Sequence, residues 1–153
     1  MRNEKTVDAL NSLVKINNDR YEGYQNAADN TDAHELKTMF GKFAQDSQKC
    51  RQELANEITN LGGTPTEATK NSGKLFRAWM DVKAAATGND REAMLNSCAY
   101  GEDNAQETYE NVLKNETEHL TQGHISMITS QKSALREDQN KVKSLQNAQE
   151  RRS

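Results

Sequence analysis

The sequence predicts an all-α protein, a four-helix bundle with a long crossover that contains a short fifth helix. Two observations carry this prediction. Only 33% of the 153 residues are hydrophobic and the mean hydropathy is −1.03, so a folded chain must gather its apolar side chains in narrow stripes, as long amphipathic helices do. The chain also has a single proline, Pro65, so helices can run without interruption almost everywhere else.

The first two predicted helices lie on either side of Asn30. Apolar residues recur before it at spacings of three and four, which is the signature of one buried helix face. A second helix begins after Asp32, a good N-cap with Glu35 three residues later, and it ends at Gly62-Gly63, which favour a left-handed stop. The two stripes are Val7, Leu10, Val14, Asn17, Tyr21, Tyr24 and Ala28, then Leu36, Phe40, Phe43, Ser47, Cys50, Leu54 and Leu61.

Two further long helices are predicted in the second half of the chain. One begins near Asn89-Asp90, where the aspartate suits an N-cap. The other begins after Asn115, where Glu116 and Glu118 match the positive end of a helix dipole. Their stripes are Leu95, Cys98, Glu102, Ala105, Tyr109 and Val112, then His124, Ile128, Gln131, Leu135, Asp138, Val142 and Leu145.

The connections predict the topology. Short turns at 30–32 and 114–116 make each pair of helices an antiparallel hairpin. Residues 62–89 are enough to return along a helix of about 25 residues, roughly 37 Å, so the second and third long helices run parallel. A helical stripe within this crossover is formed by Leu75, Trp79, Val82 and Ala86. Two hairpins joined by one long crossover are the ferritin-like version of the four-helix bundle.

Length and charge narrow the setting. We expect one domain over 1–153, with a core of about 5–145 and a tail at 146–153 that frays because its apolar positions run out. The 20 basic and 23 acidic residues are mixed along the chain, which argues against nucleic acid and anionic membranes as partners. Without a long apolar run or a signal peptide, a cytoplasmic location is expected. Cys50 and Cys98 are predicted to be reduced, buried packing residues.

Four polar side chains are predicted to meet halfway along the bundle. The register of the two hairpins brings Asn17, Ser47, Glu102 and Gln131 to one level. Because an unpaired carboxylate in a dry core is costly, we expect Asn17 and Gln131 to donate hydrogen bonds to Glu102. This layer is interpreted as a structural device that fixes helix register, with a vestigial or weak metal site as the alternative.

Two more buried polar residues are predicted to find tyrosine partners. Asp138 falls level with Tyr24, and His124 falls level with Tyr109, so each tyrosine hydroxyl can satisfy one of them. His124 is therefore interpreted as a core histidine and not as a metal ligand.

A di-metal centre in such a bundle needs a Glu from each of two helices and a Glu-x-x-His from each of the other two. The predicted central layer offers one carboxylate, Glu102. Glu116-x-x-His119 is the one Glu-x-x-His in the chain, and its position in a first helical turn is explained by capping and the dipole. We expect no catalytic residue, no metal and no other cofactor, and iron or manganese remains the alternative.

The crossover helix carries a surplus of large apolar side chains, Leu75, Phe76, Trp79 and Met80. A helix that covers a bundle needs only one apolar face, so the surplus predicts a subunit contact and a homodimer or other homo-oligomer. The alternative is that Trp79 plugs the groove between helices.

Four short motifs occur along the chain: Glu22-Gly23-Tyr24, Leu61-Gly62-Gly63-Thr64-Pro65, Trp79-Met80-Asp81-Val82-Lys83 and Cys98-Ala99-Tyr100-Gly101-Glu102-Asp103-Asn104-Ala105. In these motifs and their order the chain resembles, over roughly residues 5–145, a bacterial family of ferritin-like four-helix-bundle proteins catalogued as a domain of unknown function. The resemblance implies the fold, no established activity and a stress association. We therefore expect a non-catalytic interaction or scaffold protein; a metal-binding bundle with oxidase or iron-handling activity is the alternative.

Overall fold

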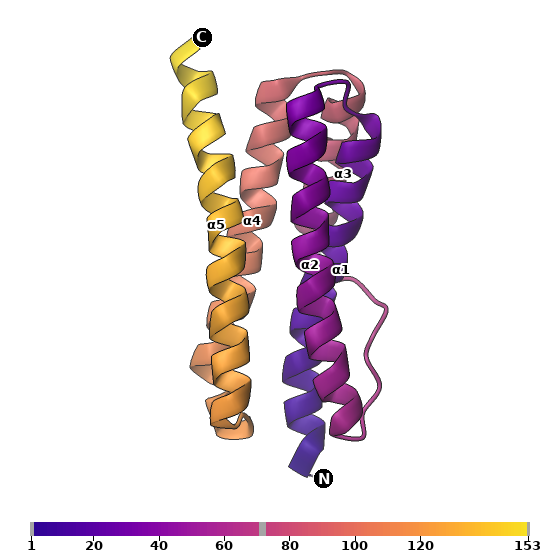
Figure 1. Ribbon diagram of the computed structural model, residues 1–153, viewed down its shortest axis with the longest axis vertical. Coiled ribbons are helices and arrows are strands. Elements are labelled where there is room, and N and C mark those ends of the chain that lie inside the picture. Colours follow the sequence, from indigo (N-terminus) through magenta and orange to yellow (C-terminus); the bar gives the residue numbers. More distant parts are fainter. Residues whose placement is uncertain (1, 71–72, 153) are drawn as a thin grey trace.

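The computed structural model describes residues 2–70 and 73–152, most of which lie in five α-helices (Figure 1). No β-strand occurs in these two ranges, so the predicted all-α class is confirmed. Four helices are long and one is short. Their bounds are α1 Arg2–Asn30, α2 His34–Asn60, α3 Gly73–Thr87, α4 Arg91–Asn115 and α5 Gln122–Arg152, with a short 3₁₀ turn, η1, over Thr117–His119.

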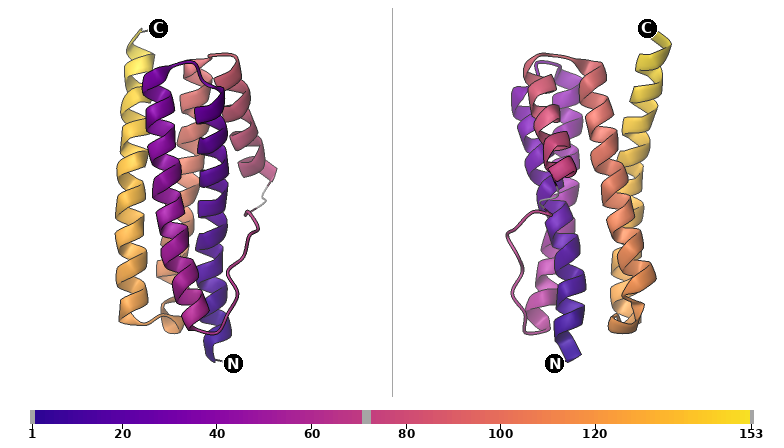
Figure 2. Two further views of the ribbon diagram at one scale, coloured as in Figure 1. Left: turned by 45° about the vertical axis from the view of Figure 1, so that its right-hand side comes forward. Right: turned by 180° about the vertical axis from the view of Figure 1, so that it is seen from behind.

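The long helices form two antiparallel hairpins, α1 with α2 and α4 with α5 (Figures 1 and 2). The chain leaves the end of α2 as an extended segment, rises through α3 and turns into α4, so α2 and α4 run in the same direction. The short α3 packs on α1 and α4. The two helices of each hairpin lie against each other along much more of their length than α2 lies against α5 or α1 against α4. The short α3 therefore joins the two hairpins, since it packs on one helix of each.

The extended segment after α2 is held by polar side chains of α1. Asn11 donates from Nδ2 to the carbonyl of Thr64 (3.1 Å) and accepts at Oδ1 from the N–H of Thr66 (2.9 Å). Two helical turns later, Asp19 Oδ2 accepts from the N–H of Lys70 (3.0 Å). A segment without a helix or sheet has no backbone partners of its own. Side chains of α1 supply these partners and fix the path of the crossover.

Two predicted helix ends are confirmed. Gly62 follows α2 with φ +83°, the left-handed conformation that favours glycine. Asp90 precedes α4, and its side chain accepts from the N–H of Ala93 at 3.1 Å.

The predicted start of α2 needs a correction, because Asp32 is not its N-cap. Ala33 occupies that position without a side-chain cap. Asp32 instead accepts from Nδ2 of Asn89 (3.2 Å) and its own N–H donates to Oδ1 of Asn89 (3.4 Å). The α1–α2 and α3–α4 turns lie at the same end of the bundle (Figure 1), and this pair of contacts links them.

The start of α5 also differs from the prediction. Residues 117–119 form η1, and α5 begins only at Gln122. Thr121 caps it: its Oγ1 accepts from the N–H of His124, while Nδ1 of His124 accepts from the N–H of Thr121, both at 3.1 Å. This is a reciprocal capping arrangement with histidine in place of the usual glutamate. At its other end, α5 is helical through Arg152, although fraying is expected for 146–153.

Tyr24 lies at the centre of an aromatic cluster in the core. Its ring centroid is 5.6 Å from that of Phe40, 5.2 Å from that of Phe43 and 5.0 Å from that of Trp79. Each such pair contributes about 0.5–1.5 kcal/mol beyond its buried area. The cluster ties α1 to α2 and α3.

Trp79 fills a slot between α1 and α4. A Cβ atom added to Gly23 or to Gly101 would overlap the indole ring, so the slot exists because both helices carry glycine at these points. Trp79 is 8% exposed and Leu75 is 1% exposed. The predicted subunit contact is wrong for these two residues, since burial against the bundle leaves them no surface to offer.

Candidate functional site

A buried arginine lies at the centre of the bundle. Arg20 of α1 is 0% exposed, and its guanidinium contacts one side chain from each of the other three long helices. These partners are Ser47 of α2, Glu102 of α4 and Asp138 of α5. We call the four residues the Arg20 cluster.

Within the cluster, the guanidinium of Arg20 makes a two-pronged contact with the carboxylate of Glu102, one hydrogen bond to each oxygen. Arg20 Nε donates to Glu102 Oε1 at 2.6 Å and Nη2 donates to Glu102 Oε2 at 3.0 Å. Nη2 also donates to Asp138 Oδ2 at 3.2 Å, and Nη1 donates to the Ser47 hydroxyl. Two parallel hydrogen bonds between opposite charges form the strongest pairing available to these groups.

Electrostatics keeps Arg20 charged. Burial by itself lowers the pKa of the guanidinium, but Glu102, Tyr24 and Asp138 raise it, and the net pKa lies above its ordinary value. The guanidinium carbon also sits 5.1 Å from the ring centroid of Tyr24, within cation–π range.

Asp138 is the member of the cluster that approaches the surface. Its Oδ1 is 3.7 Å from Nζ of Lys42, and that Nζ is 2.9 Å from Oδ2 of Asp46. Burial raises the pKa of the Asp138 carboxyl to about 7; Arg20 opposes this rise, while Asp46 and Glu102 add to it. Asp138 therefore changes charge near neutral pH, whereas Arg20 does not.

A second polar network, the Tyr109 network, lies beside the first. The Tyr109 hydroxyl accepts from Asn17 Nδ2 and donates to Gln131 Oε1, both at 2.8 Å. Gln131 Nε2 donates in turn to the Cys50 carbonyl (3.2 Å) and to Oε1 of Glu53 (3.0 Å). Its buried links are hydrogen bonds between neutral groups, and Glu53 closes it toward the surface.

The predicted central layer is therefore divided between two networks. Ser47 and Glu102 belong to the Arg20 cluster, while Asn17 and Gln131 belong to the Tyr109 network. The expected hydrogen bonds from Asn17 and Gln131 to Glu102 are wrong. A buried carboxylate pairs with a full positive charge in preference to neutral amides, and Arg20 supplies that charge.

The two predicted tyrosine pairings are also wrong. Asp138 pairs with Arg20, and no described residue hydrogen-bonds to the Tyr24 hydroxyl. His124 uses Nδ1 in the cap of α5, and its Nε2 lies 3.7 Å from Oε1 of Glu57. His124 is a buried structural residue, as interpreted, but Tyr109 is not its partner.

Arg20 is the member of the site that sequence reasoning missed. It lies three residues after Asn17 and four before Tyr24, which places it on the same helix face as both. The predicted stripe runs through Tyr21 instead, because arginine side chains are usually solvated. The sequence feature that could have identified Arg20 is Glu102, which lies on the apolar stripe of another helix. A buried carboxylate is costly unless a cation pairs with it.

The residues present do not fit a di-metal carboxylate centre. Both oxygens of Glu102 accept from Arg20. In the two described ranges, no group of three or more His, Cys, Asp or Glu side chains is arranged to hold a metal ion. Cys50 and Cys98 are free and buried, as predicted, and burial raises the pKa of the Cys50 thiol to about 11.

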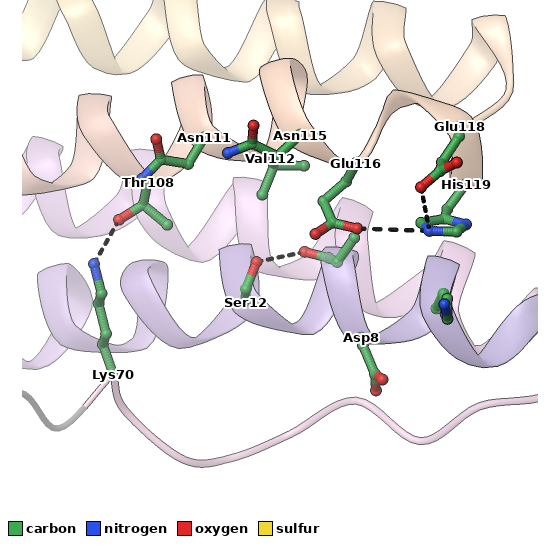
Figure 3. A pocket seen from close by; sticks show the side chains of 12 residues that line it. Asp8, Ser12, Lys70, Thr108, Asn111, Val112, Asn115, Glu116, Glu118 and His119 are labelled. Atoms are coloured by element: carbon green, nitrogen blue, oxygen red, sulfur yellow. Dashed lines mark hydrogen bonds and ion pairs between the residues drawn. The ribbon is translucent and has the colours of Figure 1, made fainter.

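The predicted Glu-x-x-His lies in a polar surface pocket of about 590 Å³ between α1 and the end of α4 (Figure 3). His119 Nε2 is 3.3 Å from Oε1 of Glu118 and 3.9 Å from Oε2 of Glu116. Across the pocket, Nζ of Lys70 is 3.0 Å from Oγ1 of Thr108. Basic and acidic side chains therefore both line the pocket, and Lys70 donates to neutral oxygens there.

Fold and site together define an all-α bundle whose core is held by an ion-paired arginine. The chain belongs to the family of the domain of unknown function DUF2383, which matches residues 5–115. The match ends with α4, so Asp138 and the rest of α5 lie outside it. No curated protein matches the chain. Among the described helices, none combines the length and apolar character that crossing a membrane requires.

Proposed function

We propose that this protein is a non-catalytic, ferritin-like helical bundle that acts in the cytoplasm as a stress-associated interaction or scaffold protein. The single observation that carries the proposal is the position of Arg20. Its fixed positive charge lies among the carboxylates that a metal centre would need. Two like unit charges about 4 Å apart repel by about 4 kcal/mol at an effective dielectric constant of about 20, so the cluster disfavours a second cation.

Metal analysis of protein purified without chelators tests this proposal. We expect iron and manganese far below one ion per chain. The matched variants are Glu102→Gln, which removes the cluster carboxylate, and Glu110→Gln, which removes an exposed one. Iron or manganese near one or two ions per chain that is lost in Glu102→Gln and kept in Glu110→Gln would overturn the proposal and favour the iron-handling alternative.

The partner of the scaffold is proposed to be a second copy of the chain, bound through α3. Phe76 is 57% exposed and Met80 is 45% exposed, and they lie one helical turn apart on the same side of α3. Exposed aromatic and methionine side chains are enriched at protein interfaces. Trp79 and Leu75 no longer belong to this contact, so they are left unchanged in its test.

Light scattering across a concentration series tests the contact. We expect a dimer mass for the wild type and a monomer mass for the double variant Phe76→Ser/Met80→Ser. Met39→Ser, a substitution of a partly buried methionine on α2, is the control and keeps the dimer mass. A monomeric wild type, or a double variant with wild-type mass, would show that α3 is not the interface.

A further inference from the structure

A groove of about 570 Å³ lies between α1, α2 and the extended segment that follows α2, which runs along α1 in Figure 2. Its apolar walls come from all three elements, namely Val14 of α1, Ala55 of α2 and Pro65 of the segment. The charged side chains that line it are Arg51 of α2, Glu22 of α1 and Glu67 of the segment. The groove therefore presents one positive and two negative charges around an apolar surface.

The guanidinium of Arg51 is held in place by neutral groups. Its carbon lies 4.9 Å from the ring centroid of Tyr21, within cation–π range, and its Nη1 donates to Oδ1 of Asn18 at 3.1 Å. Asn18 is 5% exposed, and its Nδ2 donates to the carbonyls of Thr66 (3.4 Å) and Ala68 (2.8 Å). Because the amide nitrogen is committed to these carbonyls, the amide oxygen faces Arg51 and fixes the orientation of the guanidinium.

The three charges of the groove have no ion-pair partners within residues 2–70 and 73–152. No carboxylate there pairs with Arg51, and one N–H donor of its guanidinium is used, by Asn18. Glu22 and Glu67 are exposed, and no cation of these two ranges pairs with them. Arg51 is thus a fixed positive group with donors to spare, at the wall of a groove that also carries two unpaired carboxylates.

We propose that this groove binds a free α-amino acid with an apolar side chain. The carboxylate of the ligand accepts from the guanidinium of Arg51, since arginine and carboxylate favour a paired geometry. The ammonium lies on the side of Glu22 and Glu67, and the side chain covers the apolar walls. A simple anion gains Arg51 but meets two carboxylates, and a simple cation meets the guanidinium. A ligand that carries both charges is complementary to the groove at both ends.

Titration of leucine into the isotope-labelled full chain, followed by N–H chemical shifts at pH 7, tests the site. We expect saturable shifts at the Arg51 side chain and at the amides of Ala55 and Glu67. Isocaproate is leucine without its ammonium, and isoamylammonium is leucine without its carboxylate. Each is expected to bind at least about tenfold more weakly, the effect of about 1.4 kcal/mol. Equal binding of either analogue, or no saturable shift with leucine, would overturn the proposal.

Matched variants locate the two charged ends. Arg51→Gln removes the guanidinium and should weaken leucine binding about tenfold or more, whereas Arg91→Gln, which changes an arginine outside the groove, should leave it unchanged. The double variant Glu22→Gln/Glu67→Gln should weaken leucine binding and strengthen isocaproate binding, because the carboxylates that repel an anion are gone. If Arg51→Gln fails to fold, Arg51→Lys keeps the charge, loses the paired geometry and should still weaken binding. Wild-type affinity for leucine in any of these groove variants would contradict the assignment.

Two derivatives separate a free amino acid from the end of a partner polypeptide. N-acetylleucine carries the carboxylate of a peptide C-terminus, and leucinamide carries the ammonium of a peptide N-terminus. Each lacks the opposite charge, so we expect both to bind more weakly than leucine. Equal or tighter binding of either derivative would overturn the choice of a free amino acid. These outcomes do not depend on the metal content or the oligomeric state, which test the proposed function separately.

Discussion

The Arg20 cluster and the Tyr109 network satisfy buried polar atoms in different ways. The first joins four helices through one guanidinium, two carboxylates and a hydroxyl. The second joins its helices through a phenol and two amides, all neutral. A buried charge that loses its partner costs far more than a buried neutral group that loses one hydrogen bond. We therefore expect the Arg20 cluster, the charged layer of the bundle, to tolerate substitution less well than the Tyr109 network, its neutral layer.

Removal of the Arg20 side chain should give the largest loss of stability among the substitutions in the two layers. Arg20→Met leaves Glu102 and Asp138 buried without their partner, and we expect a loss of about 3–5 kcal/mol in the free energy of unfolding. Urea denaturation measures it. The control Arg91→Met removes an exposed pair with Glu35 and should cost less than about 1 kcal/mol. Similar losses in both variants would mean that the cluster is not ion-paired in solution.

We expect the pH dependence of stability to come from two buried carboxyls, Asp138 of the Arg20 cluster and Asp19 of α1. Folding raises the pKa of Asp138 from 3.8 to about 7 and that of Asp19 from 3.8 to about 6, in both cases because of burial. Between pH 4 and these values the folded chain holds more protons than the unfolded chain. Stability is therefore greatest at the acidic end of this window and falls as pH rises, by a few kcal/mol at about 1.4 kcal/mol per pKa unit.

Urea midpoints from pH 4.5 to 8 measure this slope. In Asp138→Asn the slope should shrink to the part that Asp19 contributes, ending near pH 6. In Tyr109→Phe it should stay as in the wild type. A wild-type slope in Asp138→Asn would assign the proton uptake to other groups.

A substitution in the Tyr109 network should reduce stability less than Arg20→Met does. Tyr109→Phe removes the hydroxyl and leaves Gln131 Oε1 without its donor, while Asn17 Nδ2 keeps a hydrogen bond to the Leu13 carbonyl at 2.9 Å. We expect a loss of about 1–3 kcal/mol in the free energy of unfolding. A loss as large as that of Arg20→Met would erase the distinction between the layers.

The smallest effect should come from the neutral member of the charged layer. Ser47→Ala removes one acceptor of Arg20 but leaves both carboxylates paired. We expect a loss of about 1 kcal/mol, measured by the same urea denaturation. A loss above that of Tyr109→Phe would show that the hydroxyl is essential to the position of the guanidinium.

The helices were predictable because local signals agreed with the global pattern. Asp90 and Gly62 mark ends that the chain does use. Asp32 carries the same local signal, yet its side chain pairs with Asn89 across the bundle end. A local rule gives no information about a partner 57 residues away.

The site was only partly predictable for a related reason. Helix phase placed Asn17, Ser47, Glu102 and Gln131 in the core correctly. The phase of a helix does not determine which buried polar groups are in contact. A side chain as long as that of Arg20 can reach groups at more than one level along the bundle. Its identity as the central cation follows from charge balance across four helices and not from the pattern of any one of them.

The slot that holds Trp79 has a consequence for sequence variation. Indole and the two facing glycines form one interlocked contact, since a methyl group at Gly23 or Gly101 would occupy the space of the ring. Homologues that carry alanine at either position must therefore carry a slimmer side chain where Trp79 stands, and the three sites should change together or not at all.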